Sequence, residues 1–133
     1  MNEPEFAQLN VMAIDDEEFA RGLITRVLEM IGVGSVLTAE NGIDALAQLE
    51  RTELAVDLVI SDIEMPEMNG YEFVRRLRYG AVPHYKELPV IMLTGKDTEK
   101  NVRSARIHKI SGFVVKPPEV NTLKDHMRRA LDR

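Results

Sequence analysis

The chain has 133 residues, 44% of them hydrophobic, and a net charge of −5. Its length suits one ordinary domain, and its composition is that of a folded protein rather than a disordered one. It contains no cysteine, which excludes a disulfide framework and thiolate chemistry. No apolar run approaches a membrane span and the acidic start is unlike a signal peptide, so we expect a cytoplasmic protein without membrane contact. The acidic balance also argues against direct binding of nucleic acid.

Predicted strands and helices alternate along the chain. Residues 1–9 are expected to form a short, loosely held N-terminal extension, followed by one domain over residues 10–133. Apolar runs predict strands at 11–14, 35–39, 57–61, 90–93 and 112–115, and apolar residues at helical spacing predict helices from about 17 to 31, 42 to 49, 70 to 80, 98 to 109 and 119 to 131. This (βα)5 alternation predicts an α/β fold, a doubly wound five-stranded parallel sheet with helices on both faces.

Residues with reactive side chains stand where the predicted strands end. Asp15 and Asp16 follow the first strand, Asp62 the third, Thr94 the fourth and Lys116 the fifth. The carboxyl ends of parallel strands meet at one edge of a sheet, so we expect these groups to converge. Three neighbouring carboxylates need a counter-charge, and Mg²⁺ suits carboxylate ligands combined with water and phosphate. With a lysine and a hydroxyl, the set suits phosphoryl transfer onto a carboxylate.

The same positions carry a resemblance that spans nearly the whole chain. Its pieces are Asp15-Asp16, Asp62-(x)₂-Met65-Pro66-(x)₂-Asn69-Gly70, Thr94-Gly95 and Phe113-Val114-Val115-Lys116-Pro117. In this order, each at a predicted strand end, they resemble the receiver domain of bacterial two-component response regulators, the chemotaxis regulators among them. The resemblance implies a flavodoxin-like sheet with strand order 2-1-3-4-5.

The resemblance also implies a role for each site residue. It makes Asp62 the phosphoacceptor and places Lys116, through a bond to Pro117 that is cis in relatives, against the phosphoryl oxygens. Thr94 and Phe113 would be the switch pair, one moving to the phosphoryl group and the other turning inward. The implied Mg²⁺ ligands are Asp15, Asp16, Asp62 and the backbone carbonyl of Glu64.

The resemblance further implies that the chain takes a phosphoryl group from a histidine kinase or a histidine phosphotransfer protein. It would catalyse only its own phosphorylation and dephosphorylation and is therefore not expected to be an enzyme in the usual sense. Phe19, near the start of the first helix, is expected either to meet the donor or to cover the core.

The expected output surface combines the fourth helix, the fifth strand and the last helix. Residues 96–133 hold 10 Lys/Arg and 5 Asp/Glu, and Arg103 and Arg106 share a helix face. We expect this surface to meet a downstream acidic protein or, as the runner-up, a second copy of the chain. Relatives usually end the fourth helix with glycine, and Lys109 in that position suggests a different or looser helix end.

Two other functions stay open at this point. A phosphatase that forms an aspartyl-phosphate on Asp62 would use a second acid two residues later, and Glu64 has that spacing. Such enzymes usually carry the nucleophile on the first strand, however, whereas Asp62 follows the third. A flavodoxin-type redox protein would need a Ser/Thr/Gly-rich loop after the first strand, where this chain is acidic.

Overall fold

The computed structural model describes residues 5–95 and 109–132 of the chain. Five parallel strands form one sheet in the order β2-β1-β3-β4-β5. The elements are β1 (Asn10–Ile14), α1 (Glu18–Ile31), β2 (Ser35–Ala39), α2 (Gly42–Arg51), β3 (Leu58–Asp62), α3 (Gly70–Arg78), the 3-10 helix η1 (Pro83–Tyr85), β4 (Val90–Thr94), β5 (Gly112–Val115) and α5 (Val120–Leu131). The predicted fold class and strand order are confirmed. The expected fourth helix, with Arg103 and Arg106, lies outside the described residues.

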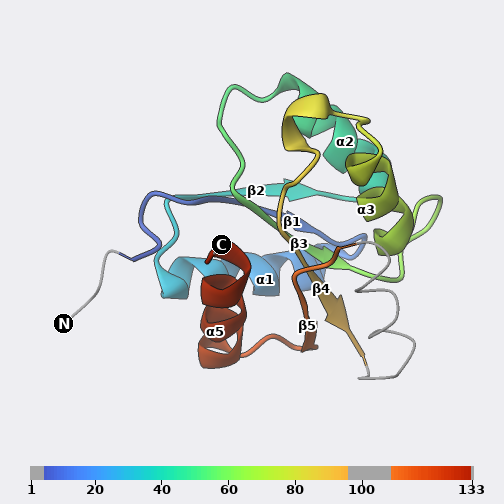
Figure 1. The fold of residues 1–133 in the computed structure, drawn as a ribbon. Coiled ribbons are helices and arrows are strands. Elements are labelled where there is room, and N and C mark those ends of the chain that lie inside the picture. The colour runs from blue at the N-terminus through green and yellow to red at the C-terminus, as the bar shows by residue number, and fades with distance from the viewer. Residues whose placement is uncertain (1–4, 96–108, 133) are drawn as a thin grey trace.

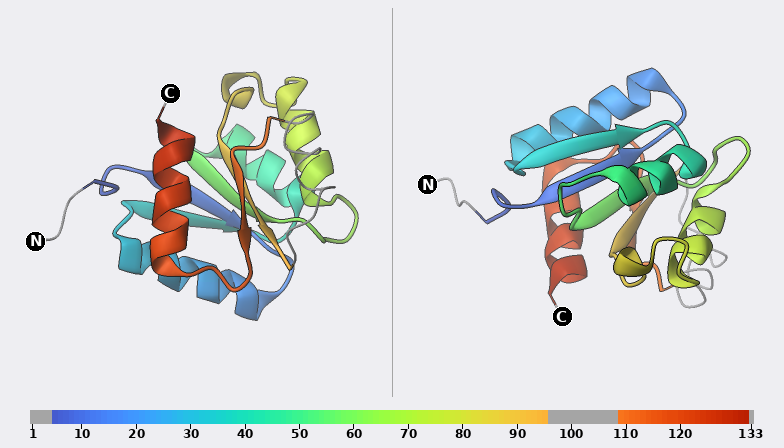
Figure 2. Two further views of the ribbon diagram at one scale, coloured as in Figure 1. Left: turned by 60° about the horizontal axis from the view of Figure 1, so that its bottom comes forward. Right: turned by 90° about the horizontal axis from the view of Figure 1, so that it is seen from above.

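Two helical layers cover the sheet because successive side chains of each buried strand point to opposite faces. Met12 and Ile14 of β1 pack into the core with α2 and α3, whereas Val11 and Ala13 pack into the core with α1 and α5. Figures 1 and 2 show α2 and α3 on one face of the sheet and α1 and α5 on the other. The sheet is therefore buried on both sides, which leaves its edges and loops for function.

Parallel pairing brings the ends of the strands to one edge of the sheet. Asp62 of β3 is in register with Leu93 of β4, and Thr94 is in register with Val115 of β5. On the other side of β3, Ser61 is in register with Ile14 of β1. The residues that follow these positions are consequently delivered to the same loop edge, as the sequence predicted.

The turn before β5 includes Lys109, whereas the rest of the expected fourth helix lies outside the described residues. Lys109 has a φ of 54°, so it adopts the left-handed conformation that glycine would favour. Its carbonyl accepts a hydrogen bond from Nη2 of Arg78 (3.0 Å), and Nη1 of the same guanidinium donates to the carbonyl of Lys86 (3.0 Å). Arg78 thus holds this turn against the end of α3, although a non-glycine residue there costs about 1 kcal/mol.

Residues 5–9 are packed onto the domain and are not loosely held, contrary to the expectation. The ring of Phe6 is 3% exposed, and it packs with the core between α1, α5 and the sheet. The carbonyl of Leu9 accepts hydrogen bonds from the amides of Gly34 (2.8 Å) and Ser35 (3.1 Å). The segment therefore contributes to the second core layer.

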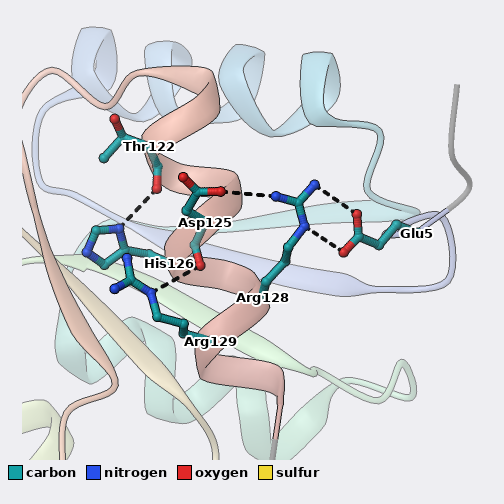
Figure 3. A network of polar contacts seen from close by, with 6 residues as sticks. All are labelled: Glu5, Thr122, Asp125, His126, Arg128 and Arg129. Atoms are coloured by element: carbon teal, nitrogen blue, oxygen red, sulfur yellow. Dashed lines mark hydrogen bonds and ion pairs between the residues drawn. The ribbon is translucent and has the colours of Figure 1, made fainter. Parts of the chain in front are cut away.

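Arg128 of α5 fastens this N-terminal segment from outside (Figure 3). Its Nε and Nη2 atoms donate to the two carboxylate oxygens of Glu5 at 2.8 and 3.1 Å, and Nη1 donates to Asp125 at 3.0 Å. The guanidinium also lies 5.8 Å from the centre of the Phe6 ring. The hydrogen bond and charge of Arg128 lower the pKa of Glu5, which keeps this carboxylate ionised.

We predict that burial of Phe6, rather than the exposed ion pair, accounts for most of the stability that this segment contributes. Phe6→Ala should lower the free energy of unfolding by about 3 kcal/mol, because it removes a buried aromatic ring. Urea denaturation followed by circular dichroism measures the change. Phe19→Ala is the matched control, since Phe19 is 79% exposed, and it should change stability by no more than about 0.5 kcal/mol. Equal effects of the two substitutions would contradict the assignment.

Candidate functional site

Three carboxylates meet at the carboxyl edge of the sheet. Asp15 follows β1 and is fully buried, Asp16 is exposed, and Asp62 ends β3 with 7% of its surface exposed. One carboxylate oxygen from each of the three lies within 4.8 Å of the others. The structure thus brings together the three aspartates that the sequence predicted as a cluster.

Among the described residues, one ammonium group contacts both buried carboxylates. Nζ of Lys116 lies 3.0 Å from Oδ1 of Asp62 and 3.5 Å from Oδ2 of Asp15. The amide of Lys116 donates to the carbonyl of Thr94 (2.8 Å), which fixes the start of the lysine's loop against the end of β4. The bond from Lys116 to Pro117 is cis, as the resemblance implied.

The pKa values of Asp62 and Lys116 reflect one positive charge shared by two buried negative charges. Burial raises the pKa of Asp62; the Lys116 hydrogen bond lowers it only in part, and the charge of Asp15 raises it further. Burial alone would lower the pKa of Lys116, but hydrogen bonds and charge from Asp62 and Asp15 outweigh burial and raise it. The ammonium is therefore held in its charged form, and the raised pKa means that Asp62 takes up a proton more readily than an ordinary aspartate.

Asp15 gives the most direct indication that the cluster suits a cation. Its Oδ1 accepts a hydrogen bond from the amide of Glu17 (2.9 Å), whereas its buried Oδ2 accepts no hydrogen bond from the residues that the structure describes and faces the Lys116 ammonium at 3.5 Å. A buried carboxylate oxygen without a hydrogen bond is costly. Oxygen donors at these separations suit a hard divalent cation, and Mg²⁺ is the one that accepts a few carboxylates together with water. The residues present therefore fit the expected metal.

The loop between β1 and α1 is held by Arg21, which the sequence analysis did not single out. Nη1 of Arg21 donates to the backbone carbonyl of Asp15 at 2.7 Å. A signal was present in the sequence, because Arg21 is the first cation of the chain and closely follows four consecutive acidic residues. Its contact steadies a loop whose carboxylates repel one another.

The position of Asp62 depends on close packing at the start of α3. A Cβ atom on Gly70 would lie 2.6 Å from the backbone oxygen of Asp62, so no larger residue fits there without movement. The Gly70 amide also donates to the carbonyl of Ile63 (2.8 Å), and the side chain of Asn69 caps α3 by accepting from the amide of Glu72 (2.9 Å). The Asn69-Gly70 pair thus closes the loop that carries the carboxylate.

The remaining predicted site residues lie as follows. Thr94 is buried at the end of β4, and Phe113 on β5 is partly buried against the core shared with α2 and α3. Glu64 is exposed, two residues beyond Asp62. Phe19 is 79% exposed, so the expectation that it covers the core is wrong. These positions leave the proposed roles of Thr94, Phe113 and Glu64 as predictions.

Comparison with known proteins defines the class of this molecule. Residues 11–128 match the response regulator receiver domain. A chemotaxis protein CheY homolog of Campylobacter jejuni is 32% identical over 123 residues, which cover 92% of each chain. The structure of Vibrio cholerae chemotaxis protein CheY4 is 33% identical with a TM-score of 0.83, covering 94% of this chain and all of that one.

A third relative is the receiver domain of the histidine kinase CKI1 from Arabidopsis thaliana, whose structure was solved in complex with Mg²⁺ and BeF₃⁻. It is 27% identical with a TM-score of 0.79, covering 97% of this chain and 94% of that one. The present chain belongs to the response regulator receiver domain family of two-component systems. Phosphoryl acceptance is the general function of these domains, and they bind Mg²⁺ at an acidic pocket. None of the helices in residues 5–95 and 109–132 has the length and apolar character that crossing a membrane requires.

We predict that Asp62 destabilises the fold at neutral pH when divalent cations are absent. Its pKa is raised in the folded state, so its contribution favours folding at acidic pH and is lost as pH rises through the folded-state pKa. In EDTA, Asp62→Asn should therefore be more stable than the wild type at about pH 7, and the difference should shrink toward about pH 4. Urea unfolding across this range measures both proteins. A wild type that gains stability over the variant as pH rises would contradict the prediction.

Proposed function

We propose that this receiver accepts a phosphoryl group on Asp62 from a phosphohistidine of a histidine kinase or a histidine phosphotransfer protein. In this step the N–P bond of the donor breaks, and a bond forms between phosphorus and a carboxylate oxygen of Asp62. The observation that carries the proposal is the cluster itself: three aspartates within 4.8 Å and a lysine 3.0 Å from Asp62. Asp62 is the member of the cluster that lies nearer to Lys116 than Asp15 does, and it is the last residue of β3.

The surrounding residues each have a defined task in this proposal. Asp15 and Asp16, with Asp62 and the backbone carbonyl of Glu64, would hold Mg²⁺, which when bound offsets the charge on the phosphoryl oxygens. Lys116 would follow a phosphoryl oxygen with its mobile ammonium. The hydroxyl of Thr94 would donate a hydrogen bond to another phosphoryl oxygen, and Phe113 would turn inward as Thr94 moves. Apart from its own phosphorylation and dephosphorylation, we assign the chain no catalytic activity.

We further propose that phosphorylation is read through the surface of the fourth helix, β5 and α5, by a downstream protein or by a second copy of the chain. Val115 of β5 is 47% exposed, which supports a contact on the described part of this surface. Arg128 contributes less free positive charge than the sequence suggested, because Glu5 and Asp125 already pair with it. The site of action would be the cytoplasm, where we expect the phosphohistidine donors.

The acceptor is tested by labelling with acetyl phosphate and Mg²⁺. Asp62→Asn should abolish incorporation, and Asp16→Asn should raise the Mg²⁺ concentration required by about tenfold or more, because one carboxylate ligand is lost. Phosphorylation is measured by intact-protein mass spectrometry. Asp132→Asn, which changes an exposed carboxylate at the end of α5, should label normally. Full labelling of Asp62→Asn would contradict the assignment of Asp62 as the acceptor. Rapid turnover of small phosphomonoesters by the wild type would favour the alternative function, a phosphatase that forms an aspartyl-phosphate.

The donor surface is tested at Phe19, which projects from the first turn of α1 beside the acidic loop. Phe19→Ala should slow transfer from the cognate phosphorylated donor by about tenfold, as expected for an exposed aromatic contact, and leave acetyl phosphate labelling unchanged. Met30→Ala is the control, because Met30 is 72% exposed on the same helix but about 16 Å further along it. Equal slowing by both variants, or of both reactions in Phe19→Ala, would argue against this role.

A further inference from the structure

The C-terminal end of α3 carries exposed side chains to which neither the fold nor the proposed phosphoryl transfer gives a task. We call this surface the α3 corner and define it by the residues that line a hollow of about 490 Å³: Glu72, Arg75, Arg76, Tyr79, Gly80 and Ala81. A hollow of this size is large enough for several side chains of a binding partner. The corner lies at the opposite end of α3 from Gly70, and the 9 residues of the helix span about 13 Å.

Tyr79 is the feature of the corner that most needs an explanation. It is 82% exposed, and among the phenylalanine and tyrosine rings of the described residues only Phe19 is likewise exposed. The guanidinium of Arg75 lies 5.9 Å from the centre of the Tyr79 ring, so the apolar ring and the cation form one surface. Tyrosine and arginine are the residue types that carry most of the binding energy in protein interfaces.

The arginines alone have a simpler explanation, which does not extend to the tyrosine. Arg75 and Arg76 complement the dipole at the helix C-terminus and pair with Glu72 at 3.6 and 3.1 Å. Those contacts stabilise the helix whether or not an aromatic ring lies beside the arginines. They therefore do not explain why Tyr79 is exposed. Leaving the Tyr79 ring in water forgoes the free energy that burying it would provide.

The backbone holds the corner in a single conformation. The amides of Tyr79, Gly80 and Ala81 donate to the carbonyls of Arg75 (3.0 Å), Leu77 (3.0 Å) and Arg76 (2.9 Å). Gly80 has a φ of 92°, which permits the sharp end of the helix, and Leu77 is fully buried beneath it. A partner would therefore meet an ordered surface and lose little free energy in ordering it.

Charge indicates what kind of partner fits. The chain as a whole carries −5, but the last turn of α3 contains Arg75, Arg76 and Arg78. Glu72 pairs with both Arg75 and Arg76 and offsets one of these charges, so the residues that line the hollow keep a net positive charge. Arg78 also binds the backbone carbonyls of Lys86 and Lys109, two further residues that are exposed. A basic surface attracts an acidic segment of a partner and disfavours a symmetric contact in which the corners of two copies face each other.

We propose that the α3 corner is a docking site for an acidic segment of a partner protein. Carboxylates of the segment pair with Arg75 and Arg76, and a neighbouring aliphatic side chain packs on the ring of Tyr79 in the hollow. Because the corner is at the far end of α3 from the aspartate cluster, docking leaves Asp62 accessible. The inference is independent of the proposed function and would hold for an unphosphorylated chain.

The test is a titration of the ¹⁵N-labelled protein, followed by amide chemical shifts, with a synthetic peptide that alternates glutamate and leucine. Shifts should concentrate in residues 72–81 and weaken as salt is added. Arg75→Glu combined with Arg76→Glu should weaken binding by about tenfold or more, and Tyr79→Ala should do so by a similar factor. Arg26→Glu, which reverses an exposed arginine on α1 across the sheet, should leave binding unchanged.

Several outcomes would overturn the proposal. Equal binding of a peptide with lysine in place of glutamate would remove the charge argument, and equal shifts with inorganic phosphate would reduce the corner to a simple anion site. Shifts outside residues 72–81, or unchanged affinity in the Tyr79→Ala variant, would move the contact elsewhere. Self-association that competes with the peptide would assign the corner to a second copy of the chain.

Discussion

The architecture of this receiver depends on an imbalance of charge at one edge of its sheet. Three aspartates lie within 4.8 Å of one another, and Lys116 is the ammonium that contacts the two buried ones. Burial raises the pKa of Asp62 and the charge of Asp15 raises it further, and the hydrogen bond from Lys116 offsets these effects only in part. Placing the carboxylates close together costs free energy in the folded chain, and the resulting site suits a divalent cation and a phosphoryl group. Burial of the sheet on both faces stabilises the fold and offsets the electrostatic cost of the carboxylate cluster.

The rest of the fold holds the carboxylates close together. Parallel pairing brings the carboxyl ends of the strands to the same edge of the sheet, and the register between β3 and β4 places Asp62 beside Leu93. Gly70 lets α3 start directly against the backbone of Asp62, where a Cβ atom would approach its oxygen to 2.6 Å. Arg21 holds the first acidic loop from the side of α1. Each of these contacts opposes the mutual repulsion of the carboxylates.

Much of this could be predicted from the sequence, because the signals are local. The apolar strands, the helices between them and the polar residues at the strand ends follow from periodicity and order along the chain. The same reasoning could not find contacts between residues distant in sequence. The bond from Arg128 to Glu5 joins positions 123 residues apart, and burial of Phe6 depends on the same packing. Nothing in the local pattern separates Phe6, which is buried, from Phe19, which is exposed.

Lys109 and the 3-10 helix η1 show a second kind of limit. Lysine at position 109 suggested a different or looser helix end, and in the structure Lys109 adopts the left-handed conformation while its carbonyl accepts a hydrogen bond from Arg78. The segment before β4 contains Pro83 and several polar residues, but Val82, Tyr85 and Leu88 are buried there, and the Tyr85 hydroxyl accepts a hydrogen bond from the amide of Val56 (3.0 Å). In both places tertiary contacts override local preference.

The central claim is that the aspartate cluster binds a divalent cation, and it is tested most directly by a crystal structure with Mn²⁺ in place of Mg²⁺. An anomalous difference map should show one strong peak bounded by Asp15, Asp16 and Asp62, with at least one carboxylate oxygen at about 2.1 Å from the ion. The same map of Asp62→Asn crystals should show a weaker peak. Absence of a peak at the cluster under saturating Mn²⁺, with Lys116 still between Asp15 and Asp62, would contradict the account.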